Sequence, residues 1–273
     1  MRYIALLLMV MAVSCASKKD TESMPKEAAL HFGAGTQSLM NKHYTDALTS
    51  LLEANKIYPN SSEIQNNLGM AYYFKGERDL AIKTLEHAIK LNEDNSDARV
   101  NLASIYLKEN DVDRAEKIYL QVLKNLTYDK QARTYYNLGL IQFDKRKNMT
   151  DAENYFVKSV NEDENFCPSW HYLGLIKYKK GKYIDALKNF RESTMGTCQP
   201  NPVTYYYQAL TLVELRRYDE ARMKLDEVDN RFPKSVYSGK ARAKMQELNQ
   251  IERQQNSEFQ VSGSGKVLET PEF

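Results

Sequence analysis

The sequence predicts an all-α fold, an array of about six helix pairs that ends in a capping helix. An alanine recurs at intervals of 34, 34, 37, 34 and 35 residues, which indicates a repeat architecture. A large residue stands four positions after each alanine, so that both lie on one face of a helix. Glycine and proline, the helix breakers, number only 11 and 7 in 273 residues. The alanines are Ala47, Ala81, Ala115, Ala152, Ala186 and Ala221, and the large residues are Leu51, Leu85, Tyr119, Phe156, Phe190 and Leu225.

The first element along the chain is a targeting segment. Arg2 precedes an apolar run over residues 4–13, which is too short to cross about 30 Å of hydrocarbon as a helix. Residues 1–14 are therefore predicted to be a secretory signal peptide. Residues 12–15 read Ala-Val-Ser-Cys, which resembles a bacterial lipobox, and this resemblance implies that Cys15 is lipidated. The alternative is an ordinary signal peptide followed by an incidental cysteine.

The residues that follow Cys15 bear on localisation. No Asp stands directly after Cys15, and in lipoproteins an Asp there favours retention in the inner membrane. We therefore expect a protein that is lipid-anchored in the outer membrane and faces the periplasm. Residues 15–26 are mostly polar and are expected to form a lipidated tether between the membrane and the fold.

The first helix of each pair carries a recurring motif. Residues 67–72 read Asn-Leu-Gly-Met-Ala-Tyr, residues 135–139 read Tyr-Tyr-Asn-Leu-Gly, and residues 170–174 read Trp-His-Tyr-Leu-Gly. These segments resemble the W-x2-L-G-x2-Y motif of tetratricopeptide (TPR) repeats, although Lys177 departs from it. The resemblance implies a right-handed superhelix of six TPR repeats over residues 27–234. The small position, at which two helices approach closely, is held by Gly35, Gly69, Ala103, Gly139, Gly174 and Ala209.

The C-terminal part divides into a helix and a tail. Residues 235–254 carry apolar side chains on or near one seam and are predicted to form the capping helix that a repeat array needs. Residues 255–273 contain Ser-Gly-Ser-Gly and little that could pack, so we expect them to be disordered.

Two further cysteines bracket the fifth repeat. Cys167 opens its first helix and Cys198 follows its second helix, so an antiparallel pair brings both to the same end. A disulfide needs Cα atoms about 4.4–6.8 Å apart, which this arrangement can supply. In an oxidising compartment we expect a structural disulfide, with two free thiols or a redox pair as the alternatives.

Composition and motifs argue against catalysis and nucleic-acid binding. The net charge is only +2, and acidic and basic residues are interspersed, whereas phosphate binding needs clustered cations. The histidines show no metal-binding spacing, and the chain has no P-loop, G-x-S-x-G or dinucleotide motif. We expect no enzyme activity, cofactor, metal or small-molecule substrate. The four histidines are His31, His43, His87 and His171.

The working surface is expected on the concave face, which the first helices line in TPR superhelices. The helix register places an apolar and aromatic strip there, a surface of the kind that usually marks a partner site. Some of these residues are expected to pack between neighbouring first helices instead. The strip consists of Phe32, Leu39, Met70, Tyr73, Val100, Leu107, Tyr136, Leu140, Phe143, Leu175, Tyr178, Tyr206, Leu210 and Val213.

A lipidated cysteine, six TPR repeats and a cysteine pair around the fifth repeat together resemble the type IV pilus pilotins of the PilF, PilW and Tgl kind. The resemblance covers nearly the whole mature chain. It implies a protein partner, the secretin of the pilus channel, which such pilotins help to localise and multimerise in the outer membrane. The alternative is a general periplasmic TPR adaptor lipoprotein, for example for cell-wall hydrolases or proteases.

Overall fold

The computed structural model describes residues 23–263, and it confirms the all-α prediction for that part of the chain. The signal peptide, Cys15 and residues 264–273 lie outside the described residues. The described residues form two compact units, which divide after Leu91 at the end of the second helix pair. None of the described helices is both long and apolar enough to cross a membrane.

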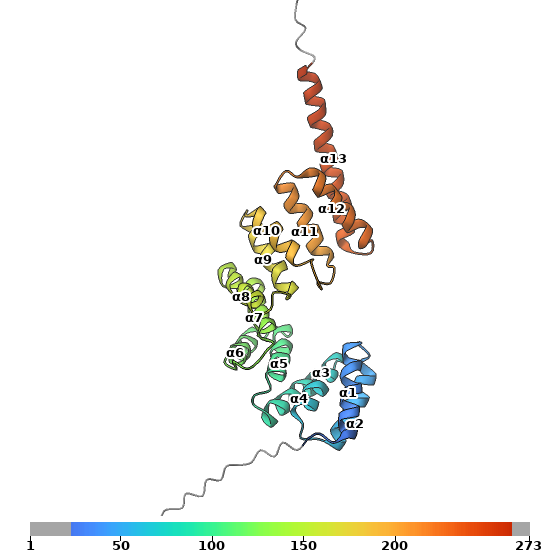
Figure 1. Cartoon of the computed structure of the whole chain (residues 1–273), viewed down its shortest axis with the longest axis vertical. Coiled ribbons are helices and arrows are strands. Elements are labelled where there is room, and N and C mark those ends of the chain that lie inside the picture. The colour runs from blue at the N-terminus through green and yellow to red at the C-terminus, as the bar shows by residue number, and fades with distance from the viewer. Residues whose placement is uncertain (1–22, 264–273) are drawn as a thin grey trace, which may run out of the picture. The chain divides into compact units, whose positions relative to one another are not determined.

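Each described element is a helix, and consecutive helices form antiparallel pairs (Figure 1). The first unit contains α1 (Lys26–Met40), α2 (Tyr44–Ile57), α3 (Ser62–Phe74) and α4 (Arg78–Leu91). The second unit contains α5 (Ser96–Lys108), α6 (Val112–Val122), α7 (Gln131–Leu140), the π-helix η1 (Ile141–Lys145), α8 (Met149–Glu162), α9 (Cys167–Lys179), α10 (Tyr183–Glu192), α11 (Pro202–Glu214), α12 (Tyr218–Arg231) and α13 (Val236–Gly263).

The small residues allow the two helices of a pair to touch. A Cβ atom placed on Gly69 would lie 2.8 Å from the Leu85 side chain and 3.3 Å from the Ala81 carbonyl oxygen. A Cβ atom on Gly174 would lie 2.5 Å from the Phe190 ring. All six alanines of the periodic pattern and the large residues four positions later are at most 1 % exposed. The core of each pair is therefore built from the residues whose spacing predicted it.

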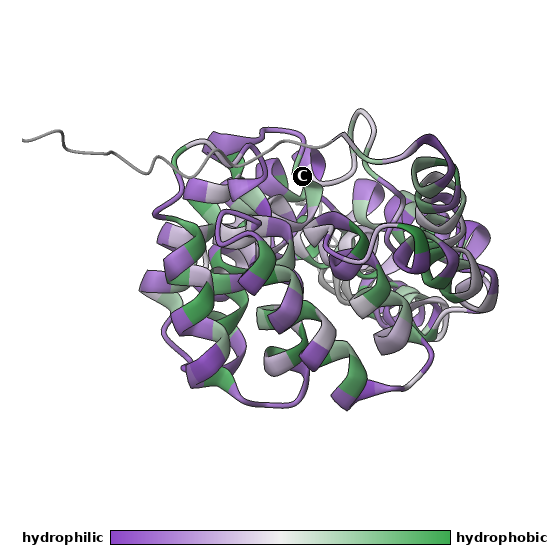
Figure 2. Cartoon of the chain, turned by 90° about the horizontal axis from the view of Figure 1, so that it is seen from below, coloured by the Kyte–Doolittle hydropathy of each residue, from purple (hydrophilic) through white to green (hydrophobic). Residues whose placement is uncertain are grey.

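Hydrophobic and hydrophilic residues are interspersed along the helices (Figure 2). Buried polar groups join neighbouring pairs. The hydroxyl of Ser169 on α9 donates to the Ser159 hydroxyl on α8 (2.7 Å), which donates to the Ala132 carbonyl on α7 (2.8 Å). Three helices are thereby joined by one chain of satisfied hydrogen bonds.

The irregular spacing of 37 residues has two structural causes. The distance from the small residue to the alanine is 12 positions in five pairs but 13 between Gly139 and Ala152. The extra residue falls in the pair that contains η1, and a π-helix is how an α-helix absorbs a single insertion. The other two residues lie in the connection 123–130 between α6 and α7, which is longer than the four-residue connections that follow α2, α4, α8 and α12.

The capping helix α13 is longer than predicted. Ala241 and Leu248 are buried against the sixth pair, and Asp229 of α12 accepts hydrogen bonds from Ser238 and from Arg242 (2.6 Å). The helix does not end at residue 254 but continues to Gly263, so residues 255–263 are helical rather than a tail. This stretch contains neither glycine nor proline before Gly263, and its Gln and Glu residues favour the helix.

Candidate partner-binding groove

Twelve of the fourteen predicted groove residues keep part of their surface exposed. In the first unit these positions lie on α1 and α3, where Phe32 and Leu39 pack beside the core while remaining partly accessible. In the second unit they lie on α5, α7, α9 and α11. The partly exposed positions are Phe32, Leu39, Met70, Tyr73, Leu107, Tyr136, Leu140, Leu175, Tyr178, Tyr206, Leu210 and Val213.

Two predicted groove residues belong to the core, and for these the prediction is wrong. Val100 is 0 % exposed, because the first turns of α5 are buried almost all round. Phe143 is 7 % exposed and lies in η1, where the extra residue turns it away from the register of a regular helix. Its ring centroid lies 5.2 Å from that of Tyr172 and 6.5 Å from that of Phe156. Neither side chain can therefore serve as a groove anchor.

Aromatic rings run through the second unit from one repeat to the next. Tyr172 on α9 is central, with its ring stacked on Phe156 at 5.0 Å and edge-on to Tyr136 at 5.9 Å. Further along, Tyr178 contacts Tyr207 at 5.7 Å, and Tyr206 contacts Tyr237 at 5.5 Å. Burial raises the pKa of Tyr178 to about 12, so its hydroxyl stays neutral at physiological pH. These rings form an aromatic series along the repeats of the second unit.

A hollow in the described part of the second unit opens next to Tyr136. It is a cavity of about 780 Å³, which is within the usual range for ligand pockets of about 300–1,000 Å³. No Asp, Glu, Lys or Arg lines it. It is lined by Tyr136, Asn165, Cys167, Pro168, His171, Tyr172, Ser193, Thr197, Gln199, Pro200, Asn201, Pro202, Val203 and Thr204.

The side chain of His171 forms part of the wall and is neutral. It is only 9 % exposed, and burial lowers its pKa to about 4. Its Nδ1 lies 2.8 Å from the Thr204 hydroxyl on α11. The cavity therefore has no charged group with which to compensate a charged ligand, and it favours a neutral, apolar or aromatic segment.

A disulfide joins Cys167 to Cys198 beside this cavity, with the two Cα atoms 5.7 Å apart. These are the two cysteines that the sequence predicts to pair. Cys167 is the first residue of α9, and Cys198 lies in the connection 193–201 between α10 and α11. That connection supplies Ser193, Thr197 and other lining residues. The disulfide thus fastens one wall of the cavity to the opposite one.

The sequence does not directly predict that His171 and Tyr172 line this cavity. The repeat spacing carries a signal, because His171 stands 35 residues after Tyr136 and 35 before Tyr206, both of which are predicted groove residues. The side chain of His171 is buried in the cavity wall, whereas Tyr172 is partly exposed.

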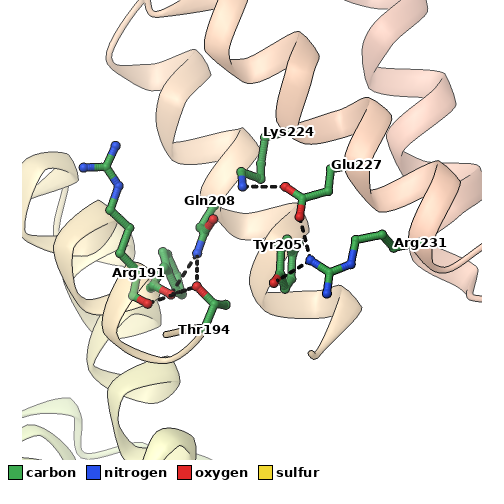
Figure 3. A network of polar contacts seen from close by, with 8 residues as sticks. Arg191, Thr194, Tyr205, Gln208, Lys224, Glu227 and Arg231 are labelled. Atoms are coloured by element: carbon green, nitrogen blue, oxygen red, sulfur yellow. Dashed lines mark hydrogen bonds and ion pairs between the residues drawn. The ribbon is translucent and has the colours of Figure 1, made fainter. Parts of the chain in front are cut away.

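A second hollow, of about 330 Å³, is lined by residues of α10, α11 and α12. Figure 3 shows the polar contacts of several of these residues. Gln208 lies at its base and donates to the Phe190 carbonyl (2.8 Å) and to the Thr194 hydroxyl (3.1 Å). Its charged groups are paired as well: Glu227 accepts from Lys224 (2.6 Å) and from Arg231 (2.7 Å).

The titration of Glu227 shows the strength of this pairing. Burial alone would raise its pKa, but the hydrogen bonds and charges of Lys224 and Arg231 outweigh burial and lower it. Because Gln208, Lys224 and Glu227 are already hydrogen-bonded within the chain, we assign this hollow to the packing of the sixth pair. Among residues 23–263, no group of three or more His, Cys, Asp and Glu side chains is placed to hold a metal ion.

Sequence comparison identifies the repeats. Two sequence models of the tetratricopeptide repeat match the chain, one over residues 75–134 and one over residues 204–235. Residues 75–134 and 204–235 therefore match the tetratricopeptide repeat, and the remaining helix pairs have the same antiparallel arrangement. A TPR repeat-containing protein of Methanocaldococcus jannaschii is 25% identical over 187 residues, which are 65% of this chain and 31% of that protein. A BBS4 homolog of Drosophila melanogaster aligns over 34% of its own length, so the chain spans about a third of these TPR relatives.

Two TPR proteins of pilus systems share the fold. The type IV pilus assembly protein PilF of Pseudomonas aeruginosa is 24% identical over 163 residues, 59% of this chain and 63% of PilF. The PilF structure superposes with a TM-score of 0.71 at 19% identity, over 80% of this chain and 97% of that one. The structure of PilW, a type IV pilus biogenesis factor, superposes with a TM-score of 0.66 at 17% identity. The superposition covers 78% of this chain and 97% of the PilW chain.

Proposed function

We propose that this chain is an outer-membrane lipoprotein that acts as a type IV pilus pilotin. It binds the secretin of the pilus channel and promotes the localisation and multimerisation of the secretin in the outer membrane. In this role the protein works by holding another protein, and no catalytic step is required of it. Cys15 carries the lipid anchor, and the TPR array faces the periplasm.

The fold that this chain shares with PilF, along nearly the whole of the PilF chain, is the observation that carries the proposal. The groove of the second unit adds to it, because its aromatic rings and its uncharged cavity suit an apolar segment of a protein partner. The conserved geometry of a repeat array alone would serve any adaptor, so the partner has to be identified directly.

Site-specific crosslinking in the bacterium that encodes the chain tests the partner. A photoreactive phenylalanine analogue at position 206 should crosslink to the secretin, because Tyr206 is a partly exposed groove residue. The matched control places the analogue at Ile184, which is 75 % exposed but lies on α10, a second helix. Deletion of the gene should also reduce secretin multimers in the outer membrane.

Two outcomes would contradict the proposal. If position 206 crosslinks to a cell-wall hydrolase or protease and never to the secretin, the chain is a general periplasmic adaptor. If both positions crosslink to the secretin equally, the groove is not the binding surface.

A further inference from the structure

Exposed apolar side chains gather at one edge of the first unit. Met40 is 71 % exposed, Phe74 is 42 % exposed and Leu80 is 47 % exposed, and each lies within four residues of a turn inside a helix pair. Large hydrophobic side chains are normally covered, so three of them at one edge call for an explanation. We call this surface the turn edge, and it consists of Met40, Lys42, His43, Tyr44, Phe74, Lys75 and Leu80.

The two turns that make up the turn edge lie side by side. The Tyr44 ring after the first turn stacks on the Phe74 ring before the second, with centroids 4.6 Å apart and planes 12° apart. The Lys75 ammonium donates to the Thr45 hydroxyl at 3.0 Å. Around these groups the surface forms an open hollow of about 500 Å³. The two turns are therefore joined through the Tyr44–Phe74 and Thr45–Lys75 contacts, and Met40 and Leu80 lie within three residues of these turns.

The chemistry of the turn edge fits a phospholipid surface. Aromatic rings and aliphatic side chains bury their apolar parts at the level of the lipid headgroups, while lysine stems lie along apolar surface and keep the ammonium among phosphates. The charges near the two turns balance, with Lys42, Lys75 and Arg78 against Asp46, Glu77 and Asp79. Attraction to lipid must then come from apolar burial rather than from net charge, so salt should weaken it little.

We propose that the turn edge docks on the phospholipid surface into which Cys15 is anchored, and this inference rests on the proposed lipid anchor. The anchor would hold the first unit close to the membrane. Residues 16–25 separate Cys15 from α1 and can span at most about 33–36 Å. The turn edge lies at the far end of α1, a helix about 22 Å long, so the tether is long enough for that end to reach the lipid.

Depth-dependent quenching tests the docking. In the oxidised chain from Cys15 to Phe273, Cys15 is the one thiol left free, because the other two cysteines of the sequence are joined. It can be coupled to maleimide lipid in vesicles of phosphatidylethanolamine with some phosphatidylglycerol and brominated lipid. The natural tryptophan is first removed by Trp170→Phe, so that Met40→Trp introduces a single tryptophan. The brominated lipid should quench the fluorescence of this tryptophan. The matched control is Leu30→Trp, since Leu30 is 72 % exposed on the same helix but ten residues away from position 40.

Equal quenching at positions 30 and 40, or stronger quenching at position 30, would overturn the proposal. A second measurement uses the chain from Ala16 to Phe273 with vesicles of the same phospholipids. Met40→Asp together with Phe74→Asp should weaken vesicle binding by about tenfold or more, whereas Leu30→Asp should leave it unchanged. If the double variant binds the vesicles as well as the parent chain does, the docking proposal is also refuted. The first measurement uses chemical coupling at Cys15 and the second uses a chain without Cys15, so both readouts are independent of natural lipidation. Natural lipidation is judged separately by mass analysis of the cellular protein.

Discussion

The imidazole Nδ1 of His171 and the hydroxyl Oγ1 of Thr204 lie 2.8 Å apart, and both side chains are buried. The contact joins α9 to α11, the first helices of two successive repeats. It also forms part of the wall of the uncharged cavity. The neutral His171 side chain thus helps to hold two successive repeats together and also keeps the cavity wall uncharged.

The stability of the second unit should depend on pH through His171. Its pKa is about 4 in the fold and 6.5 as the ordinary value, so the unfolded chain takes up the proton first as the pH falls. The stabilisation is complete above pH 6.5 and is lost progressively down to pH 4, by about 3 kcal/mol at most. Urea unfolding at several pH values should show this slope, and His171→Gln should remove that part of it. An identical pH dependence in the two proteins would contradict the assignment.

The close approach of paired helices can be tested at Gly174. A Cβ atom there would lie 2.5 Å from the Phe190 ring, so Gly174→Ala should destabilise the protein by about 1–3 kcal/mol despite the better helix propensity of alanine. Gly239 in α13 is the matched control, since a Cβ there would meet nothing within 4 Å. Gly239→Ala should be neutral or stabilising by up to about 1 kcal/mol. Equal melting temperatures for the two variants would disprove the packing argument.

Loss of the disulfide should destabilise the fifth repeat. A disulfide reduces the entropy of the unfolded chain, and for residues 31 apart this stabilises the folded state by about 3–4 kcal/mol. Cys198→Ser should lower the melting temperature and increase hydrogen exchange in α9 and α10, while Cys15→Ser should change neither. Non-reducing peptide mapping of protein from its native compartment should find Cys167 linked to Cys198. Two free thiols in that preparation would rule the disulfide out.

Groove and core positions should respond differently to a charge. Tyr178→Asp and Tyr206→Asp should weaken partner binding by about 2 kcal/mol or more, with circular dichroism and melting temperature near those of the parent protein. Phe143→Asp should instead lower the melting temperature sharply, because it places a charge among Phe156 and Tyr172. Ile184→Asp is the surface control. Normal binding by both tyrosine variants would remove these residues from the interface.

The anchor can be tested at Cys15. Cys15→Ala should abolish lipidation, and the protein should no longer fractionate firmly with the outer membrane. A variant that still resists detergent-free washing of that fraction would show that the protein is held there by something other than this lipid.

The helix pairs could be predicted from the sequence because their cause is local. Each alanine and its large partner, such as Ala186 and Phe190, must face the small residue of the preceding helix, and that requirement repeats along the chain. The extent to which neighbouring helices bury each side chain could not be predicted in the same way. Register gives the direction of Val100 around its axis, but it does not show that neighbouring helices bury it completely.

The candidate site was predicted only in part. Tyr136 and Tyr206 followed from the helix register, whereas the cavity depends on the path of the connection 193–201, which has no periodicity to predict it. The burial of Phe143 depends on the π-helix. The odd spacing between Gly139 and Ala152 was visible in the sequence, but it did not show where in the pair the extra residue would lie.

That extra residue has a consequence for how such chains diverge. An insertion inside a packed helix would normally shift every later contact by 100°, yet η1 confines the change to a single turn, and Ala152 and Phe156 still reach their partners. In this array the order of contacts is therefore kept although the number of residues between them differs from one pair to another. The two regions that match repeat models, 75–134 and 204–235, leave out η1 and the disulfide connection. Relatives whose insertions fall at these two places could keep the same array while their sequences lose the regular period.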